Sequence, residues 1–302
     1  ARLSAEQNSG LEHRGKTPNF RYFNLKGLTD LTFNEYDELQ PLQWPLWSRQ
    51  QADGAVARIY AKGHFSHVDG KAKFIAITAI DPVNQVCSEF PLVLTTGRIR
   101  DQWHTMSRTG LSANFSTHRA EPFCEIHPHD ALKYGIKDGE LVEVKSKWGN
   151  CVLRAPVSDD IRRGQVFAPI HWNDQVASDA RIGKVVNPVV DAISGEPEFK
   201  HTPVIIHPFY SQWQGVFYVR QGFEQIVQAS IQNTVWWTKI TTAKAVRYEL
   251  ADRKKFTQTT EHLKELLPFQ DESFEWLNIE DQTAHISHSI VLKDGHLIAS
   301  LY

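Results

Sequence analysis

One polar segment of this 302-residue chain gathers side chains that suit anion binding. It follows residues 91–94, an apolar run that predicts a buried strand, and Thr95-Thr96-Gly97, whose glycine permits a turn. Three arginines against one aspartate give residues 98–108 a charge of +2, whereas the whole chain carries −2. The polar and aromatic residues of this segment are Arg98, Arg100, Asp101, Gln102, Trp103, His104, Thr105, Ser107 and Arg108.

These residue types fit a phosphorylated ligand. Hydroxyls, backbone N–H groups and guanidiniums that gather behind one strand supply hydrogen-bond donors for phosphate oxygens. Trp103 adds a flat face on which a heterocycle can stack. The alternative is a solvated surface loop whose Trp103 folds back onto the core.

The composition predicts a soluble globular protein. Hydrophobic residues make up 41% and charged residues 23% of the chain, and no apolar run approaches the roughly 18 residues of a membrane span. A net charge of −2 argues against general nucleic-acid binding, which leaves a basic footprint. The length predicts about two domains.

The cysteines give no sign of a disulfide framework or a metal centre. Cys87, Cys124 and Cys151 are widely spaced and form no C-x-x-C pair, so neither zinc nor iron–sulfur binding by cysteine is supported. All three lie in or beside predicted strands, and we therefore assign them to structure.

Two pairs of histidines are close enough in the sequence to consider as metal ligands. His64 and His67 flank a predicted turn, but no third ligand is evident. His127 and His129 flank Pro128, which suits the first position of a short helix. We expect a helix-capping role for the second pair and no metal site at either.

The N-terminal region predicts one helix and one hairpin. Capping-box spacing from Thr32 to Glu35 predicts a short helix. Apolar runs on both sides of Asp69-Gly70 predict a β-hairpin from residue 55 onward, with its second strand at 74–80.

The middle of the chain predicts a compact β barrel rather than alternating βαβ units. One helix from Pro128 to Gly135 interrupts the strands, and no G-x-G-x-x-G follows a strand, which excludes a Rossmann fold. Residues 175–200 predict a long loop of the kind that is usually functional. Strands are predicted at 123–126, 141–146, 151–157, 165–170 and 202–206.

The last third predicts a small α+β domain. Helices are expected at 221–232 and 257–267. Strands are expected at 234–241, 244–250 and 274–279, followed by a pair within 284–302 that turns at Asp294-Gly295.

Four blocks of sequence, in order, resemble the molybdopterin-dinucleotide-binding domain that ends the molybdenum oxidoreductases of the dimethyl-sulfoxide-reductase family. They are PLVLTTGRIRDQWHTMSRTG, EIHPHDALKYGIKDGELVEVKSKWGN, GQVFAPIHWND, and VVNP with EFKHTPV. The stretch from FAPIHWND to EFKHTPV looks most like that of bacterial assimilatory nitrate reductases. The resemblance covers nearly the whole chain and is strongest over residues 88–207.

The resemblance implies a mainly β fold, namely a double-psi β-barrel followed by a small α+β domain. Residues 1–86 would end a preceding catalytic-core region. Residues 87–207 would form the barrel that binds a molybdopterin guanine dinucleotide, and residues 208–302 the C-terminal domain.

The resemblance also places the cofactor-binding residues. Carried over position by position, they are Thr96, Gly97, Arg98, Ile99, Arg100, Asp101, Gln102, Trp103, His104, Thr105, Arg108, Asn187 and Lys200. By this reading the arginines pair with phosphate, Trp103 and His104 hold the pterin or guanine, and Asn187 and Lys200 close the far side. The alternatives are a turn-forming asparagine and a solvated lysine.

Two further residues are weaker candidates, and the chemistry is expected elsewhere. His171 and Trp172 lie at a predicted strand end that faces the presumed site. No catalytic residue and no metal ligand is expected in this chain, because the metal's protein ligand and the [4Fe–4S] cysteines of this family precede the region that matches.

The implied function is that of a C-terminal fragment of a cytoplasmic molybdenum-dependent nitrate reductase of nitrate assimilation, truncated at both ends. The parent would use the bis-dinucleotide molybdenum cofactor and an iron–sulfur cluster held outside this fragment, and the fragment alone would be inactive. Expected partners are the rest of the catalytic subunit and an electron-donor protein or domain, with no nucleic acid and no membrane. Alternatives are another substrate, such as formate or an S- or N-oxide, and a non-redox β-barrel binding or scaffold module.

Overall fold

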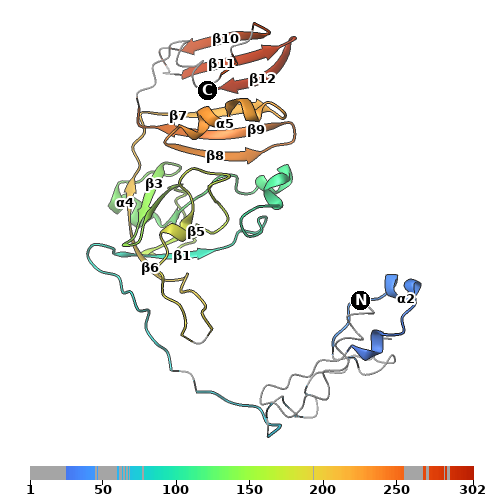
Figure 1. Ribbon diagram of the computed structural model, residues 1–302. Helices are drawn as coiled ribbons and strands as arrows, with labels where there is room; N and C mark the ends of the chain where they lie inside the picture. Colours follow the sequence, from blue (N-terminus) through green and yellow to red (C-terminus); the bar gives the residue numbers. More distant parts are fainter. Residues whose placement is uncertain are drawn as a thin grey trace. The chain divides into compact units, whose positions relative to one another are not determined.

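The structure is a computed structural model that divides into two compact units, Ala1–Ile80 and Asp81–Tyr302 (Figure 1). We describe each unit by itself. The residues described are 25–44, 46, 60, 63, 65, 67, 69–76, 78–192, 194–254, 268–269, 272–281, 283 and 286–302.

The first unit contains the short helix that the sequence predicts. Helix α2 (Phe33–Asp37) begins at Thr32, whose side chain accepts a hydrogen bond from the Glu35 N–H, while Glu35 accepts one from the Thr32 N–H at 2.8 Å. This reciprocal capping box is confirmed. A 3-10 helix, η2 (Lys26–Leu28), precedes it.

The strand predicted at 74–80 is wrong for the residues described there. Phe74 is 97% and Ile75 78% exposed, and the described residues of this stretch form no strand. An apolar run becomes a strand only when a neighbouring strand supplies hydrogen bonds and a packed face, which periodicity does not reveal. Much of the predicted first strand, and His64, lie outside the described residues.

The second unit is mainly β and opens with a six-stranded sheet ordered β2-β5-β1-β6-β3-β4. Central strand β1 alternates buried and half-buried residues, runs parallel to β5 and is antiparallel to β6. The strands are β1 (Leu92–Gly97), β2 (Glu125–Ile126), β3 (Leu141–Lys145), β4 (Asn150–Arg154), β5 (Gln165–Pro169) and β6 (Thr202–Pro208). These positions agree with the predicted strands to within a few residues, but the predicted end of the first strand at Thr95-Thr96-Gly97 is wrong. Strand β1 continues through these residues because they pair with β5.

Helix α4 (Pro128–Tyr134) has the ends that its sequence predicts. Pro128 takes the first turn, and the His127 ring accepts a hydrogen bond from the His129 N–H at 3.0 Å. Gly135 ends the helix at φ 68°, a left-handed conformation that suits glycine. The capping role expected for His127 is confirmed.

Two of the three cysteines belong to the core of this sheet. Cys124 and Cys151 are fully buried thiols, and burial raises the pKa of each well above its ordinary value. Cys87 is exposed, so a structural role of its thiol finds no support. It precedes β1 in a stretch without regular structure, where no sheet face covers it.

The second sheet has the order β10-β11-β12-β7-β9-β8, and Figure 1 shows helix α5 (Glu224–Gln232) lying against it. Val227 and Ile231 of α5 are buried in one cluster with Phe217 and Tyr248. The strands are β7 (Trp213–Arg220), β8 (Trp236–Thr241), β9 (Ala245–Asp252), β10 (Phe274–Asp281), β11 (Ile286–Lys293) and β12 (His296–Leu301). Strand β7 was not predicted, and the helix predicted at 257–267 lies outside the described residues.

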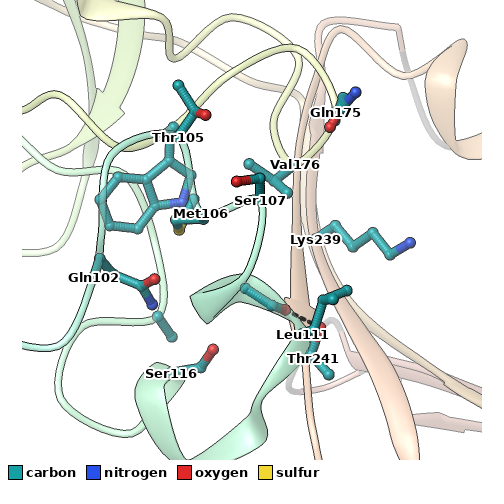
Figure 2. A pocket seen from close by; sticks show the side chains of 13 residues that line it. Gln102, Thr105, Met106, Ser107, Leu111, Ser116, Gln175, Val176, Lys239 and Thr241 are labelled. Carbon is teal, nitrogen blue, oxygen red and sulfur yellow. Dashed lines mark hydrogen bonds between the residues drawn. The ribbon is translucent and has the colours of Figure 1, made fainter. Parts of the chain in front are cut away.

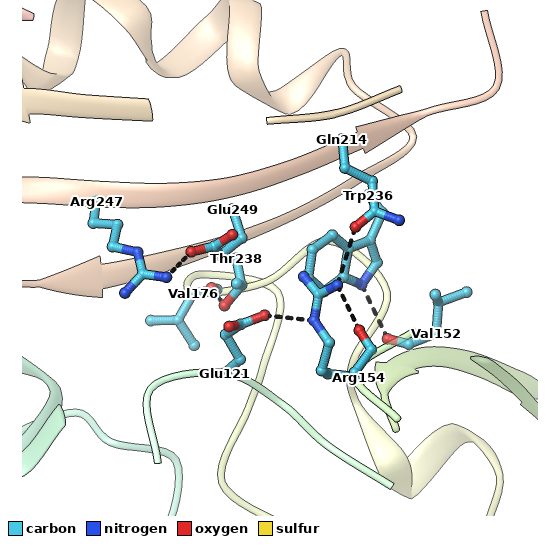
Figure 3. Close-up of polar contacts among 10 residues, drawn as sticks. Glu121, Val152, Arg154, Val176, Gln214, Trp236, Thr238, Arg247 and Glu249 are labelled. Carbon is cyan, nitrogen blue, oxygen red and sulfur yellow. Dashed lines mark hydrogen bonds and ion pairs between the residues drawn. The ribbon is translucent and has the colours of Figure 1, made fainter. Parts of the chain in front are cut away.

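The two sheets meet through polar contacts (Figure 3). Arg154 of β4 donates hydrogen bonds to Glu121 at 2.9 Å and to Gln214 of β7 at 3.1 Å. Trp236 of β8 lies under the Arg154 guanidinium and donates its ring N–H to the Val152 carbonyl at 3.1 Å. These hydrogen bonds connect β7 and β8 of the second sheet to β4 of the first.

No helix in the part of the chain that the structure describes is long and apolar enough to cross a membrane.

Candidate functional site

The predicted binding loop leaves the sheet where two parallel strands end. Gly97, the last residue of β1, is the register partner of Pro169, the last residue of β5. The Ile170 N–H continues the ladder by donating to the Gly97 carbonyl at 3.0 Å. Because both strands end at one edge, the segments 98–108 and 170–179 begin side by side.

His171 joins these two segments. Its Nε2 accepts a hydrogen bond from the Ile99 N–H at 2.9 Å, and its Nδ1 lies 2.6 Å from the His104 carbonyl, to which it donates. The side chain is fully buried, and this burial is the main cause that lowers the pKa of His171. The hydrogen bond to the His104 carbonyl acts in the opposite direction, and the nearby positive charge of Arg98 lowers the pKa further. A neutral imidazole therefore holds both ends of residues 99–104.

Further hydrogen bonds fix the loop from inside. Asn173 donates from its side-chain amide to the Thr105 carbonyl at 2.9 Å. Gln102 is buried, donates to the Phe115 carbonyl at 2.9 Å and accepts from the Thr109 hydroxyl at 2.7 Å. The Gln102 side-chain amide therefore makes its hydrogen bonds to other residues of this region.

The backbone of the loop includes an uncommon conformation. His104 has φ 43° and Met106 has φ 61°, both in the left-handed region that non-glycine residues rarely adopt. Such conformations persist where surrounding contacts fix them, and they concentrate at binding and catalytic sites. Here the carbonyl of His104 is held by His171, and Met106 is buried.

The exposed side chains of the loop carry its positive charge. The Arg98 guanidinium lies 5.2 Å from the centre of the Trp103 ring, which is 56% exposed, and the His104 ring meets Trp103 edge-on at 4.4 Å. Arg108 is also exposed. Among the described residues no carboxylate pairs with Arg98 or Arg108, so both guanidiniums are available to an anion.

Arg100 differs from the other two arginines. It donates two hydrogen bonds to the Asp101 carboxylate, at 2.7 and 2.8 Å. This contact lowers the pKa of Asp101 and raises that of Arg100. The pair is neutral as a whole, so the net charge of the loop is presented by the other two arginines.

Lys200 lies at the base of the loop, 104 positions away in the sequence. Its ammonium donates to the Thr96 carbonyl, and the Thr96 hydroxyl donates to the Phe199 carbonyl at 3.0 Å. Gly97 is packed tightly here, because a Cβ at this position would lie 2.9 Å from the Phe167 ring and 3.8 Å from the Lys200 amine.

Asn187 fixes the long loop that carries Lys200. The residue is 3% exposed, and its side-chain amide donates to the carbonyls of Glu198 at 3.1 Å and His201 at 2.9 Å. Its carbonyl oxygen accepts from the Val189 N–H at 2.9 Å. The structure therefore brings Lys200 to the predicted loop directly and Asn187 to it through the 198–201 backbone.

A cavity of about 210 Å³ lies between this loop and the second sheet (Figure 2). Its walls combine loop residues with two residues of β8, Lys239 and Thr241. Trp172, the other weak sequence candidate, is 3% exposed and lines this cavity. No sequence pattern indicated β8 as a neighbour of the loop.

Within the part that the structure describes, no three His, Cys, Asp or Glu side chains cluster as metal ligands. The donors gathered at the loop are guanidinium, ammonium, hydroxyl and backbone groups, which bind phosphate oxygens rather than cations.

Residues 92–203 match the family described as "Molydopterin dinucleotide binding domain". This segment belongs to that family. The molybdopterin dinucleotide binding domain begins at the first residue of β1 and ends in β6, so it contains the loop at 98–108, Asn187 and Lys200.

The relatives with similar sequences include nitrate reductases and formate dehydrogenases. The chain is 38% identical over 214 residues to a nitrate reductase of Klebsiella oxytoca, covering 70% of this chain and 23% of that protein. It is 32% identical over 185 residues to the assimilatory nitrate reductase catalytic subunit of Bacillus subtilis, covering 60% and 25%. It is 37% identical over 132 residues to the F420-dependent formate dehydrogenase 1 subunit alpha of Methanococcus maripaludis, covering 44% and 19%. The chain thus spans a quarter or less of the length of these relatives.

Proposed function

We propose that the loop at 96–105, with Arg108, Asn187 and Lys200, binds a molybdopterin guanine dinucleotide, and that the whole protein is a molybdenum-dependent nitrate reductase. The observation that supports this most strongly is the contact between Lys200 and the Thr96 carbonyl. It joins two parts of the family's binding segment that are far apart in the sequence.

The residues present fit such a ligand. Arg98 and Arg108 offer unpaired guanidiniums to a pyrophosphate, with which arginine forms strong, directional hydrogen bonds. The exposed Trp103 ring offers a face to a heterocycle, and the Lys200 ammonium adds positive charge at the base of the loop. Asn187 and Gln102 contribute by holding the backbone, while the neutral Arg100–Asp101 pair adds donors without net charge.

When bound, the cofactor would supply the molybdenum for two-electron oxygen-atom transfer, by which the whole protein reduces nitrate to nitrite. In this proposal residues 1–302 bind and orient the dinucleotide and carry neither the metal's ligand nor an iron–sulfur centre. Purified residues 1–302 would therefore not reduce nitrate with a viologen dye. Turnover without another chain would contradict this assignment.

We further propose that residues 87–207 form a double-psi β-barrel, residues 208–302 a small α+β domain, and residues 1–86 the end of a preceding catalytic-core region. The parallel pairing of β1 with β5, with β6 beside them, supports the barrel. The proposed partners are the rest of the catalytic subunit and an electron donor, and a cytoplasmic location stays a prediction.

A second candidate keeps the cofactor and changes the substrate to formate. The formate dehydrogenase of M. maripaludis, at 37% identity, favours it, whereas the match to the K. oxytoca nitrate reductase covers more of the chain.

A third candidate, a non-redox binding module, predicts no preference for guanine nucleotides.

Calorimetric titration of the full chain with GDP, and with ADP for comparison, tests the binding proposal. We expect GDP to bind more tightly than ADP, and Arg98→Ala to weaken GDP binding about tenfold or more, since a charge-assisted hydrogen bond contributes roughly 1.5–3 kcal/mol. Lys254→Ala, which removes an exposed charge after β9, should leave GDP affinity unchanged. Equal affinity of Arg98→Ala and the wild-type chain would overturn the proposal.

A further inference from the structure

Strand β8 forms backbone hydrogen bonds with the segment that follows β5. Ala177 pairs with Thr238 in an antiparallel bridge. The Lys239 N–H donates to the Val176 carbonyl at 2.7 Å, and the Ser178 N–H donates to the Trp237 carbonyl at 2.9 Å. Residues 176–178 therefore act as one more short strand beside β8.

The same segment is also held by the first sheet. The Val152 N–H of β4 donates to the Asp179 carbonyl at 2.7 Å, next to the bond between Trp236 and the Val152 carbonyl. Hydrogen bonds from both sheets thus fix the position of residues 176–179.

These contacts continue to the predicted binding loop. The N–H groups of Val176 and Ala177 both donate to the Asn173 carbonyl at 3.0 Å. The side chain of Asn173 holds Thr105, and His171, two residues earlier, holds Ile99 and His104. A displacement of β8 would therefore be transmitted through this turn to the backbone of residues 99–105.

A second contact reaches the loop directly. The Thr241 hydroxyl of β8 donates to the Gly110 carbonyl at 2.7 Å (Figure 2). The Gly110 N–H in turn donates to the carbonyl of Met106, one of the two loop residues with positive φ. Thr241 thus holds the backbone at residues 106–110, and the 176–179 segment connects through Asn173 and His171 to residues 99–105.

We propose that β8 is a positioning element for the dinucleotide-binding loop and that Thr241 is its positioning residue. The inference rests on the proposed function and assigns a role to the C-terminal sheet, which lies outside residues 92–203 of the matched family. The sheet would hold the loop arginines and Trp103 in their binding conformation before the dinucleotide arrives. Binding would then cost less conformational entropy.

The test compares Thr241→Val with Thr242→Val in the full chain. The Thr242 hydroxyl also donates to a carbonyl, that of Ala245 at 2.8 Å, but within its own sheet. Amide hydrogen exchange of residues 99–111, urea unfolding and GDP titration are measured for both variants, with Thr241→Ser as the conservative rescue. If Thr241→Val does not fold, Thr238→Val, which loses the 3.2 Å bond to the Val176 carbonyl, takes its place.

We expect Thr241→Val to speed exchange of residues 99–111 and to weaken GDP binding by about three- to tenfold, the effect of one partly buried hydrogen bond. Thr241→Ser should restore both, and Thr242→Val should change neither. Wild-type exchange of the loop in Thr241→Val would overturn the inference. Absence of GDP binding by the wild-type chain would instead contradict the proposed function. The two outcomes can be told apart because the exchange measurement is made without ligand.

Discussion

The imidazole of His171 accepts a hydrogen bond from the backbone N–H of Ile99, 72 positions earlier in the sequence, at 2.9 Å. The opposite nitrogen donates to the His104 carbonyl. A single buried side chain therefore sets the distance between Ile99 and His104, the two ends of the loop segment that carries Trp103.

Stability should depend on pH through His171. Its folded-state pKa is lower than the unfolded value of about 6.5, so the unfolded state binds more protons below that pH. The contribution is complete above about pH 6.5 and is lost as pH falls through the folded-state pKa.

We therefore expect His171→Gln to unfold more easily at pH 7.5, by about 1–3 kcal/mol, and to lose less stability than the wild-type chain between pH 7.5 and 5.5. Urea unfolding at both pH values checks this, with His207→Gln on the exposed side of β6 as the control. An undiminished pH dependence in His171→Gln would be evidence against a neutral buried imidazole.

Gly149→Ala should destabilise the second unit. A Cβ at Gly149 would lie 2.4 Å from the Lys184 carbonyl oxygen, a main-chain atom that has little room to move. We expect a loss of roughly 1–3 kcal/mol in the free energy of unfolding, measured by urea titration. Gly183→Ala is the matched control, since nothing lies within 4 Å of its Cβ, and comparable losses in both variants would refute the steric explanation.

Asn187→Asp should loosen the loop that carries Lys200. The change keeps the shape of the side chain but replaces an amide donor with an acceptor that faces the carbonyls of Glu198 and His201. We expect a cost of about 1–3 kcal/mol for buried groups left unpaired, together with faster amide exchange at 198–202. The exposed Asn278, changed in the same way, should show neither effect.

Trp103→Ala should weaken nucleotide binding while leaving the fold intact. The ring is more than half exposed, so little packing is lost. Stacking of a base on an aromatic ring contributes roughly 1–3 kcal/mol, and GDP affinity measured by calorimetry should fall accordingly. Tyr210→Ala, at an 80% exposed aromatic residue, controls for the loss of a surface ring. An unchanged GDP affinity in Trp103→Ala would exclude stacking on this residue.

The local features of the fold were predictable because their causes are local. Thr32 and Glu35 cap α2, and Pro128 and Gly135 bound α4, as their spacing predicts. The apolar run at 91–94 likewise predicts β1, although the strand continues through Thr95-Thr96-Gly97, where the glycine was expected to end it. In each case residues a few positions apart determine the structure.

The long-range features were predictable only in part. Resemblance to a family grouped Lys200 with the Thr96 loop as cofactor-binding residues, and the Lys200 ammonium does contact the Thr96 carbonyl. Cofactor binding by either residue stays a prediction. Nothing in the sequence indicated that His171 bonds to Ile99, because such pairing depends on the parallel register of β1 and β5. Strand β7 was not predicted because Gln214 and Gly215 interrupt its apolar run. The strand predicted at 74–80 is wrong because no neighbouring strand pairs with the residues described there.

The most direct test of the central claim is amide hydrogen exchange of the full chain with and without saturating GDP. The account predicts slower exchange at residues 96–105 and around Lys200, with no change in β10 and β11. Protection confined to β10 and β11, or none at residues 96–105, would contradict it.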